Sequence, residues 1–518
     1  MNPAAPSAAW LRRAFLFAVA AFGWALFSNN TADSDLWGHV LYGQRMLALG
    51  QLEWTDPFSW TAAGAPWINH EVLAELALGW VHLHAGGPGL WLLMLALSGA
   101  TIWIALREAA RDTPGGAVAL AVGFALSARN LSMGFAARPQ LWTALGLAVL
   151  LVALRRLHDG RRWPLVALPI MSVVWANTHG GVLAGVLLTV VAAGVLMLQR
   201  SPVAGRFALV AVAAVLALPL SPWGLDGVRW LLQSVAYSRP EITEWRPLPF
   251  DLLHLPFFVL AAVSIAAWMF TGRERRTWEG AVLAVLLVMA LQHRRHAPLF
   301  LLGNLMFSTA HLRDLGLQTA AKLDALAKLF RQTAVRAFLA VLFVAAGAAF
   351  LVDSVRAPRL KPWTIEVERN IYPMEAVRFI KGHELRGNLL VLFEWGQLAI
   401  WQLPDNQVSF DGRLDTVYPH KVIDAHWKFY RDEAVDPEAL DLGRADIALL
   451  PANLASVTRL LYRGWKLVYA DPLAWVLVRD EAAQPGLRGL PLPIYRKRDA
   501  VSGRDAFPDA PSARSTAR

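Results

Sequence analysis

Eleven apolar segments follow one another through the first 353 residues, separated by charged residues or by proline and glycine. A helix needs about 20 mostly apolar residues to cross the hydrocarbon core of a bilayer. The segments, several of them short, lie at 14–28, 88–106, 116–134, 139–154, 163–178, 182–199, 206–221, 252–271, 277–293, 297–312 and 337–353. This series predicts a mainly α-helical, polytopic membrane bundle of about eleven spans.

Charged residues divide the chain in two. Residues 1–352 contain 26 Lys and Arg and 17 Asp and Glu, about 12% charged, whereas residues 353–518 contain 23 and 22, about 27%. Soluble domains average about 25% charged residues. We therefore expect a transmembrane domain over 1–355 with a long outer loop at 29–87, a soluble α/β domain over 360–482, and a disordered tail over 483–518 that is rich in Pro, Arg and Ser.

The composition excludes several classes of protein. The chain has no cysteine, so thiol catalysis, disulfide bonds and Cys-ligated zinc are ruled out. The net charge is +10, and residues 1–352 contribute +9 of it, so the charge belongs to the apolar part and indicates no nucleic-acid partner. No G-x-G-x-x-G or G-K-[ST] motif supports the use of a nucleotide.

The basic residues beside the apolar segments predict the orientation. Arg12 and Arg13 precede the first segment, and basic residues near spans favour the cytoplasmic side. With an odd number of spans, the C-terminal domain is then extracytoplasmic. Ionisable residues at membrane depth are costly and usually mark a site. Those expected on the outer side are Asp33, Asp35, His70, Glu71, Arg138, His179, Glu244, Arg294 and Arg295.

Asp33 and Asp35 form a D-x-D pair at the end of the first span. From Asp35 to Leu49 apolar residues recur at helical spacing, so an acidic start also suits a helix N-terminus. The carboxylates either cap this helix, or act as a general base or as metal ligands. We expect Asp35 to be the catalytic residue in preference to Asp33, because it heads the amphipathic stretch.

Two further outer segments carry candidate binding residues. His70-Glu71 begins a second amphipathic stretch but lacks the second histidine of a zinc-protease motif, so substrate hydrogen bonding or capping is expected in preference to metal binding. Arg294 and Arg295 lie in a dense positive cluster, which on the outer side runs against the positive-inside rule. Because the guanidinium fork suits phosphate, we expect the cluster to bind an anion, and pairing with outer acidic residues is the alternative.

The C-terminal domain reads as α/β. A helix is expected at 372–380, and strands are expected at 389–393, 408–413, 447–450, 465–469 and 475–478. Asp411 and Arg413 lie in a polar loop that either binds substrate or forms a solvated turn.

Together these features resemble the GT-C type of integral membrane glycosyltransferase. The shared features are a cytoplasmic N-terminus, a long outer loop that begins with acidic residues, two amphipathic stretches and many further spans. The strings that look like those of bacterial multi-spanning proteins related to this superfamily are Asp35-Leu36-Trp37-Gly38-His39, Asp56-Pro57-Phe58-Ser59, Trp67-Ile68-Asn69-His70-Glu71, Ala137-Arg138-Pro139-Gln140 and Phe410-Asp411-Gly412-Arg413. The resemblance covers most of residues 10–480.

The resemblance implies an enzyme of the bacterial inner membrane that transfers a sugar from a polyprenyl-phosphate-linked donor, with inversion, at the outer face. The family's catalytic acidic residue would map onto Asp33 or Asp35, and its phosphate-holding basic residues onto Arg294, Arg295 or Arg138. The acidic pair is followed here by Leu-Trp-Gly-His, whereas better-known members have a Tyr-containing stretch. A divalent metal is left open, with Asp33 and Asp35 as its ligands if one takes part.

Two other functions are compatible with the sequence. A transporter of lipid or polysaccharide would also be polytopic, but transporters commonly show paired repeats or broken helices in corresponding halves, and we see no internal repeat. A non-catalytic envelope assembly protein on the same scaffold is the other alternative.

Overall fold

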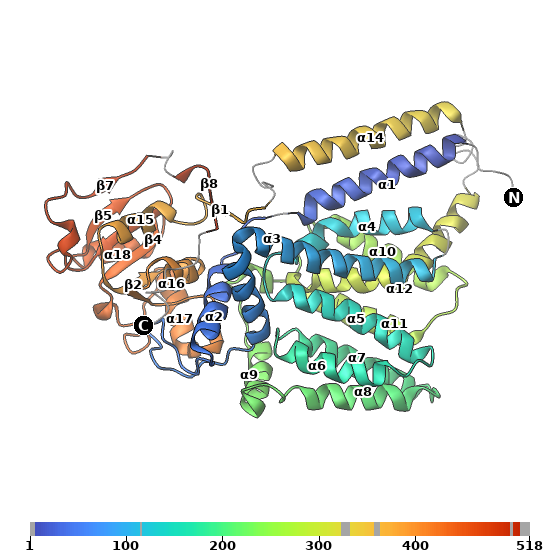
Figure 1. Ribbon diagram of the computed structural model, residues 1–518, viewed down its shortest axis with the longest axis horizontal. Coiled ribbons are helices and arrows are strands. Elements are labelled where there is room, and N and C mark those ends of the chain that lie inside the picture. Colours follow the sequence, from blue (N-terminus) through green and yellow to red (C-terminus); the bar gives the residue numbers. More distant parts are fainter. Residues whose placement is uncertain are drawn as a thin grey trace. The chain divides into compact units, whose positions relative to one another are not determined.

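The computed structural model describes residues 6–28, 30–113, 116–322, 332–356, 363–497 and 501–507. It is mainly helical and ends in an α/β region (Figure 1). Its contacts divide it into two units. The helical unit comprises Met1–Asn30, Leu92–Gly224 and Ser238–Pro362, and the α/β unit comprises Thr31–Trp91, Leu225–Tyr237 and Trp363–Arg518.

Each of the eleven apolar segments coincides with a helix. These helices are α1 (Pro6–Phe27), α3 (Val72–Arg111), α4 (Ala117–Ser132), α5 (Gln140–His158), α6 (Pro164–Ala176), α7 (Val182–Leu198), α8 (Ala204–Ala217), α10 (Leu255–Phe270), α11 (Thr277–Gln292), α12 (Ala297–Lys322) and α14 (Thr333–Arg356). By length and composition, α1, α3, α5 and α14 are able to cross a membrane, and six of the others are apolar but only 10–17 residues long. The helix positions are confirmed, and the number of spans stays a prediction.

Helices α1 and α14 run side by side in the helical unit (Figure 1). Phe15 packs edge-on against Phe343 with ring centroids 5.2 Å apart, and Phe22 meets Phe350 at 5.1 Å. Only 6% of the most apolar stretch of α14 is buried inside the protein. Such an apolar surface on a helix of this length suits contact with lipid tails.

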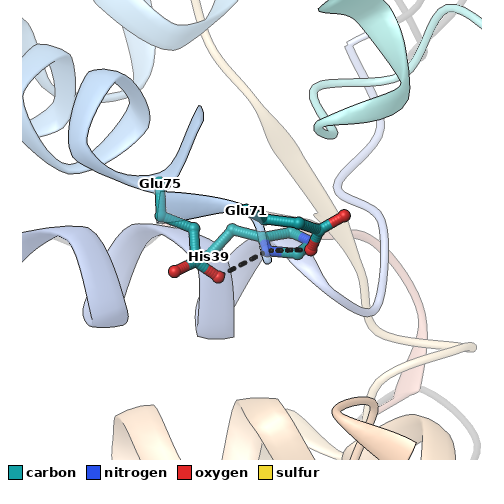
Figure 2. Close-up of side chains that lie close together, drawn as sticks. All are labelled: His39, Glu71 and Glu75. Atoms are coloured by element: carbon teal, nitrogen blue, oxygen red, sulfur yellow. Dashed lines mark hydrogen bonds and ion pairs between the residues drawn. The ribbon is translucent and has the colours of Figure 1, made fainter. Parts of the chain in front are cut away.

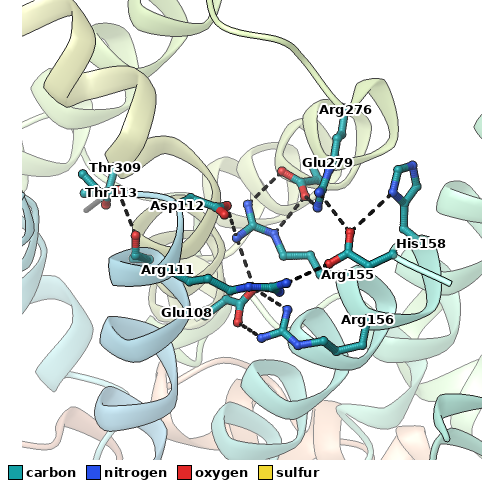
Figure 3. A network of polar contacts seen from close by, with 12 residues as sticks. Glu108, Arg111, Asp112, Thr113, Arg155, Arg156, His158, Arg276, Glu279 and Thr309 are labelled. Atoms are coloured by element: carbon teal, nitrogen blue, oxygen red, sulfur yellow. Dashed lines mark hydrogen bonds and ion pairs between the residues drawn. The ribbon is translucent and has the colours of Figure 1, made fainter. Parts of the chain in front are cut away.

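A buried network of ion pairs ties α3, α5 and α11 together at one end of the helical unit (Figure 3). Arg155 of α5 is its centre: Nε and Nη2 donate to the two carboxylate oxygens of Glu279 at 2.8 and 2.9 Å. Its Nη1 lies 2.8 Å from Asp112 Oδ2 and 3.4 Å from Glu108 Oε1. Removing one partner from a buried pair typically costs about 3–5 kcal/mol, so this network is expected to hold the three helices in register.

The α/β unit is built on a six-stranded mixed sheet with the order β3-β2-β4-β6-β5-β7. Its strands are β2 (Gly387–Val391), β3 (Asn406–Val408), β4 (Ile447–Pro451), β5 (Lys466–Ala470), β6 (Ala474–Val478) and β7 (Ile494–Tyr495). Strand β2 is parallel to β3 and β4, and β6 is antiparallel to β4 and β5. The predicted α/β character of this region is confirmed.

Six further short helices belong wholly or mostly to the α/β unit. They are α2 (Leu36–Leu49), α9 (Gly224–Ala236), α15 (Met374–Gly382), α16 (Gly396–Gln402), α17 (His420–Tyr430) and α18 (Ala455–Tyr462). Single 3-10 turns include η1 (Thr243–Trp245) and η2 (Arg294–His296) of the helical unit. The core of the sheet is apolar, with Leu390, Ala448, Leu450 and Leu477 buried against Phe429.

The first outer loop belongs to the α/β unit, whereas the sequence assigned it to a transmembrane domain over 1–355. Backbone bridges explain the difference: Thr31 pairs with Glu366, and Ser59 pairs with Val408 of β3. A buried side-chain ion pair adds to them, with Arg413 Nη1 2.7 Å from Asp56 Oδ1. Contacts between residues this far apart in the chain leave no periodic pattern in the sequence.

The tail predicted to be disordered from residue 483 contains regular structure where it is described. Strand β7 joins the sheet beside β5, and β8 (Arg504–Ala506) pairs antiparallel with β1 (Glu366–Glu368). Arg504 bridges to Glu366 at 2.7 Å, so the charged residues that suggested disorder are paired across the strands. Residues 508–518 lie outside the described part of the chain.

Candidate functional site

The candidate residues fall into three groups. The acidic group, in the α/β unit, contains Asp33, Asp35, His70 and Glu71 together with His39, Asn69 and Glu75. The arginine group, in the helical unit, contains Arg138, His179, Glu244 and Arg295. Arg294 precedes Arg295 in the sequence. Asp411 and Arg413 form a third group inside the α/β unit.

Two glycines bring α2 and the first turns of α3 together. A Cβ at Gly43 would lie 1.8 Å from the carbonyl oxygen of Glu75, and one at Gly79 would lie 2.6 Å from the backbone nitrogen of Gln44. The helices therefore touch backbone to backbone, which only glycine permits. His39 lies one helical turn before Gly43, and Glu75 lies one turn before Gly79. The crossing thus places His39 against Glu75.

His39 lies between two glutamates (Figure 2). Its Nδ1 is 3.2 Å from Glu75 Oε1 and 3.6 Å from Glu71 Oε2. The other oxygen of Glu75 accepts a hydrogen bond from Asn69 Nδ2 at 2.5 Å, which fixes the orientation of this buried carboxylate. Glu71 is only partly buried, and its Oε1 lies 3.6 Å from His70 Nε2. Glu71 is therefore the one of the two carboxylates that has access to solvent.

The two histidines of the acidic group have opposite charge states. Burial by itself lowers the pKa of His39, but the hydrogen bond to Glu75 and the charges of Glu71, Glu75 and Asp35 outweigh it and raise the pKa from 6.5 to about 9. Burial lowers the pKa of His70, and the nearby charge of Glu71 does not restore it. At neutral pH, His39 is therefore an imidazolium ion among carboxylates, and His70 is neutral.

Asp35 is the residue before α2, but its side chain makes no capping hydrogen bond to the described first turn. Gln397 of α16 takes that place, since its Oε1 accepts the backbone N–H of Gly38 at 3.1 Å. The Asp35 carboxylate instead lies against Gly412, where an added Cβ would be 2.4 Å from Oδ1. Asp33 Oδ1 accepts the backbone N–H of Asp35 at 3.1 Å. The geometry thus favours the alternatives to capping for Asp35.

Among the described residues, His39, Glu71 and Glu75 are the group whose ligand atoms lie close enough to share a metal ion, all within 4.8 Å of one another. One imidazole nitrogen with two carboxylates suits Zn²⁺ or Mn²⁺, and the Asn69 amide would orient Glu75 from behind. A bound ion would polarise an oxygen of the substrate, and it would displace the proton of His39. Asp33 and Asp35, the ligands expected from the sequence, are not members of this group.

Asp411 and Arg413 are buried, with 0% and 6% of their surface exposed. Arg413 Nε and Nη2 donate to both oxygens of Asp411 at 2.9 and 2.7 Å, and Tyr418 Oη donates to Asp411 Oδ2 at 2.6 Å. The guanidinium also lies over the ring of Trp67 at 5.0 Å. These contacts engage both charges and join the first outer loop to the sheet, so the solvated turn is wrong. Substrate binding by Asp411 and Arg413 stays a prediction.

The arginine group is arranged around Glu244 of η1. Arg295 Nη1 lies 3.1 Å from one carboxylate oxygen, and Arg138 Nη1 donates to the other at 3.4 Å. Burial alone would raise the pKa of Glu244, but the charges of Arg295 and Arg138 lower it from 4.5 to about 2. The Arg295 guanidinium also lies 4.5 Å from the ring centroid of Trp245. Acidic pairing, the alternative to an anion site, is thus present, but two guanidinium charges face one carboxylate.

His179 also belongs to the arginine group, and Arg294 directly precedes Arg295 in η2. His179 Nδ1 accepts the backbone N–H of Gly181 at 2.9 Å and lies 2.8 Å from Thr143 Oγ1. A neutral His179 therefore carries its proton on Nε2. The backbone N–H of Arg294 donates to the carbonyl of Arg246 at 2.9 Å, which ties η2 to the segment after η1. A net positive charge built on short turns between helices suits recognition of a phosphate.

Reasoning from the sequence missed His39, Asn69 and Glu75 as members of the acidic group. His39 and Asn69 occur inside two of the strings that carry the resemblance, and Glu75 follows Glu71 by one helical turn. The available signal is the spacing His39-x-x-x-Gly43 and Glu75-x-x-x-Gly79. A polar residue one turn from a glycine, on each of two adjacent amphipathic helices, indicates a close crossing with a polar contact beside it.

Comparisons with known proteins identify the architecture. No family model matches the sequence, and no curated protein matches it. The apo oligosaccharyltransferase of Archaeoglobus fulgidus is a structural neighbour with a TM-score of 0.52 at 11% identity, over 87% of this chain and 70% of that chain. The same organism's AglB, in complex with an inhibitory peptide and a dolichol-phosphate, matches with a TM-score of 0.51 at 12% identity, over 92% and 75%.

A bacterial structure matches over nearly its whole length. Apo ArnT from Cupriavidus metallidurans has a TM-score of 0.52 at 14% identity, over 90% of this chain and 97% of that chain. AglB and ArnT are both GT-C glycosyltransferases and polytopic membrane proteins. Identities this low show the fold alone. The chain therefore has the fold of the GT-C integral membrane glycosyltransferases.

Proposed function

We propose that the protein is an inverting glycosyltransferase that moves a sugar from a polyprenyl-phosphate-linked donor to an extracytoplasmic acceptor. The observation that carries the proposal is a pair of partly exposed carboxylates, Asp35 and Glu71, around the protonated His39, on a scaffold shared with enzymes that use lipid-linked donors. The neighbour bound to a dolichol-phosphate supports a donor linked to a lipid phosphate.

In this proposal a carboxylate of the acidic group removes the proton from an acceptor hydroxyl, and the resulting oxygen attacks the anomeric carbon of the donor. The new glycosidic bond forms as the bond between that carbon and the phosphate oxygen breaks, so the anomeric configuration is inverted. We assign the base to Asp35. Asp33 orients it, because Asp33 Oδ1 accepts the backbone N–H of Asp35. His70 and Glu71 are assigned to hydrogen bonding of the substrate.

The arginine group is assigned to the phosphate of the donor. Phosphate carries more negative charge as the sugar leaves, and guanidinium groups in a site of low dielectric constant stabilise that charge. Arg138 and Arg295 already have one carboxylate between them, which holds both side chains in place before an anion binds. Arg294 and His179 would contribute further donors.

We also propose the orientation: a bacterial inner-membrane protein with its N-terminus in the cytoplasm and its α/β unit outside, in contact with membrane lipids and the lipid-linked sugar. A reporter that is active only outside the cytoplasm, fused after Asp480, should be active. Activity of a cytoplasmic reporter at the same position would contradict this topology.

The function is tested by following the donor. Purified protein in nanodiscs would be incubated with a total lipid-linked sugar extract and an extract of envelope glycans, and release of free polyprenyl phosphate would be measured by mass spectrometry. A transferase releases the lipid phosphate only when both extracts are present. A transporter or an assembly protein leaves the lipid-linked sugar intact, which would refute the proposal.

A further inference from the structure

Helix α9 (Gly224–Ala236) is amphipathic, and none of its residues is buried. Its apolar residues recur at positions 225, 228, 231, 232 and 235, which is the spacing of one helical face. Three of these five side chains are exposed, Leu225, Leu232 and Val235, by 65%, 59% and 62%, and Val228 and Leu231 are half-buried. An exposed apolar face on a short helix is expected to contact another protein surface or a membrane in the cell.

The opposite side of α9 is attached to the α/β unit. Trp230 Nε1 donates to the carbonyl of Asp415 at 2.9 Å, and its ring lies 4.5 Å from the ring of His70. Just beyond the helix, Tyr237 stacks on His420 at 4.0 Å and donates to Asp424 Oδ1 at 3.1 Å. The open apolar face therefore points away from the side that holds the helix in place.

We infer that the open face of α9 docks on the surface of the lipid bilayer. At 13 residues, with Asp226, Arg229 and Gln233 along it, α9 is too short and too polar to cross the hydrocarbon core, and it suits an interfacial helix. Asp226 and Arg229 form an exposed pair at 2.8 Å, which belongs in water.

The chain around α9 identifies lipid as the occupant. Helix α8, which precedes it, exposes apolar side chains along its length, among them Leu209, Val212 and Leu216. Only residues 218–223 connect α8 to α9, and so short a connection spans at most about 25 Å even when it is extended. If α8 faces lipid, the chain brings α9 within reach of the same bilayer. A single face of 13 residues is also small for a stable protein interface, which takes about 20–30 residues a side.

This docking would link the bilayer surface to the acidic group, because Trp230 contacts His70 and His70 lies beside Glu71. That consequence rests on the proposed function, whereas the docking itself does not. In a transferase whose donor is a lipid, a helix seated on the bilayer would hold the carboxylates at a constant height above the lipid phosphates.

The absence of cysteine allows single-site labelling without background. Leu232→Cys and Val235→Cys would carry an environment-sensitive fluorophore on the open face, and Gln233→Cys would carry it on the polar face as the matched control. Each labelled protein would be placed in phosphatidylcholine nanodiscs, with or without doxyl-labelled lipid, and titrated with iodide. We expect doxyl lipid to quench the labels at 232 and 235 several-fold more than the label at 233, and iodide to show the reverse order.

Two results would overturn the inference. Equal quenching of all three labels by iodide would mean that the face is in water. Protection of 232 and 235 from both quenchers would mean that protein covers the face, either a second copy of the chain or another part of it. Neither readout involves sugar transfer, so a failed docking prediction and a failed transferase assignment are distinguishable.

Discussion

Protonation of His39 gives the acidic group a measurable pH dependence. The pKa is raised from 6.5 to about 9 in the folded protein, and each unit is worth about 1.4 kcal/mol, so the charge contributes about 3 kcal/mol to the stability of the α2–α3 contact. A raised pKa stabilises fully below the unfolded value of 6.5 and loses its effect as the pH rises through 9. Opening of α2 should therefore become about a hundredfold easier between pH 6.5 and 9.5.

Hydrogen exchange with mass spectrometry measures this opening directly, because amide protection reports the free energy of local unfolding. Peptides covering Leu36–Leu49 should lose protection over that range after correction for the intrinsic rate. EDTA would be present, so that no metal ion competes with the proton for the imidazole. His39→Gln removes the titrating group, and its pH slope should be flat.

The matched control is His70→Gln. The pKa of His70 is lowered from 6.5, so this residue is neutral in the folded and unfolded states above about pH 7.5. Its replacement should leave the slope above that pH as it is in the wild type. The reasoning is refuted if His39→Gln keeps the wild-type slope, since some other group then titrates in this window.

Three further predictions concern the proposed reaction. Asp35→Asn should reach the membrane at normal levels yet lose about 10²–10⁴-fold in transfer rate, the usual contribution of a general base, and normal transfer would return the residue to a structural role. Gly412→Ala places a Cβ 2.4 Å from the Asp35 carboxylate and should lower transfer, whereas Gly382→Ala, where nothing lies within 4 Å, should not; equal effects would contradict the contact. Replacing Arg294 and Arg295 together by Lys should weaken binding of polyprenyl phosphate by about tenfold or more while membrane insertion stays normal, and unchanged binding would exclude a bidentate clamp.

Helix positions could be predicted from the sequence because lipid imposes a simple pattern. Each spanning helix must be apolar on nearly every side, so segments such as 182–199 and 277–293 coincide with α7 and α11 almost to the residue. Strands β4 and β6 of the sheet are buried on both faces, and their short apolar runs between polar turns are equally local signals.

The division of the chain into units could not be predicted in the same way. Asp56 and Arg413 lie 357 residues apart and form a buried ion pair. Neither residue stands in a sequence pattern that distinguishes it from a surface residue. The backbone bridge between Ser59 and Val408 brings the two segments together, so that the ion pair can form. The packing of a long loop against a distant part of the chain therefore cannot be predicted from patterns within short stretches of sequence.

The strings that suggested a family have a physical explanation once the α/β unit is folded. Gly38 lacks a Cβ because the Gln397 side chain occupies that space, and Gly412 lacks one because Asp35 and Gln397 do. The string that begins at Asp35 thus contacts the string that contains Gly412. The contact depends on glycine, which has no side chain that would suggest a functional role. Gly412 lets the Asp35 carboxylate lie close against the backbone, and the ion pair between Asp56 and Arg413 fixes the same loop. A carboxylate fixed by contacts on several sides, and still partly exposed, is in the condition that a base for an acceptor hydroxyl requires.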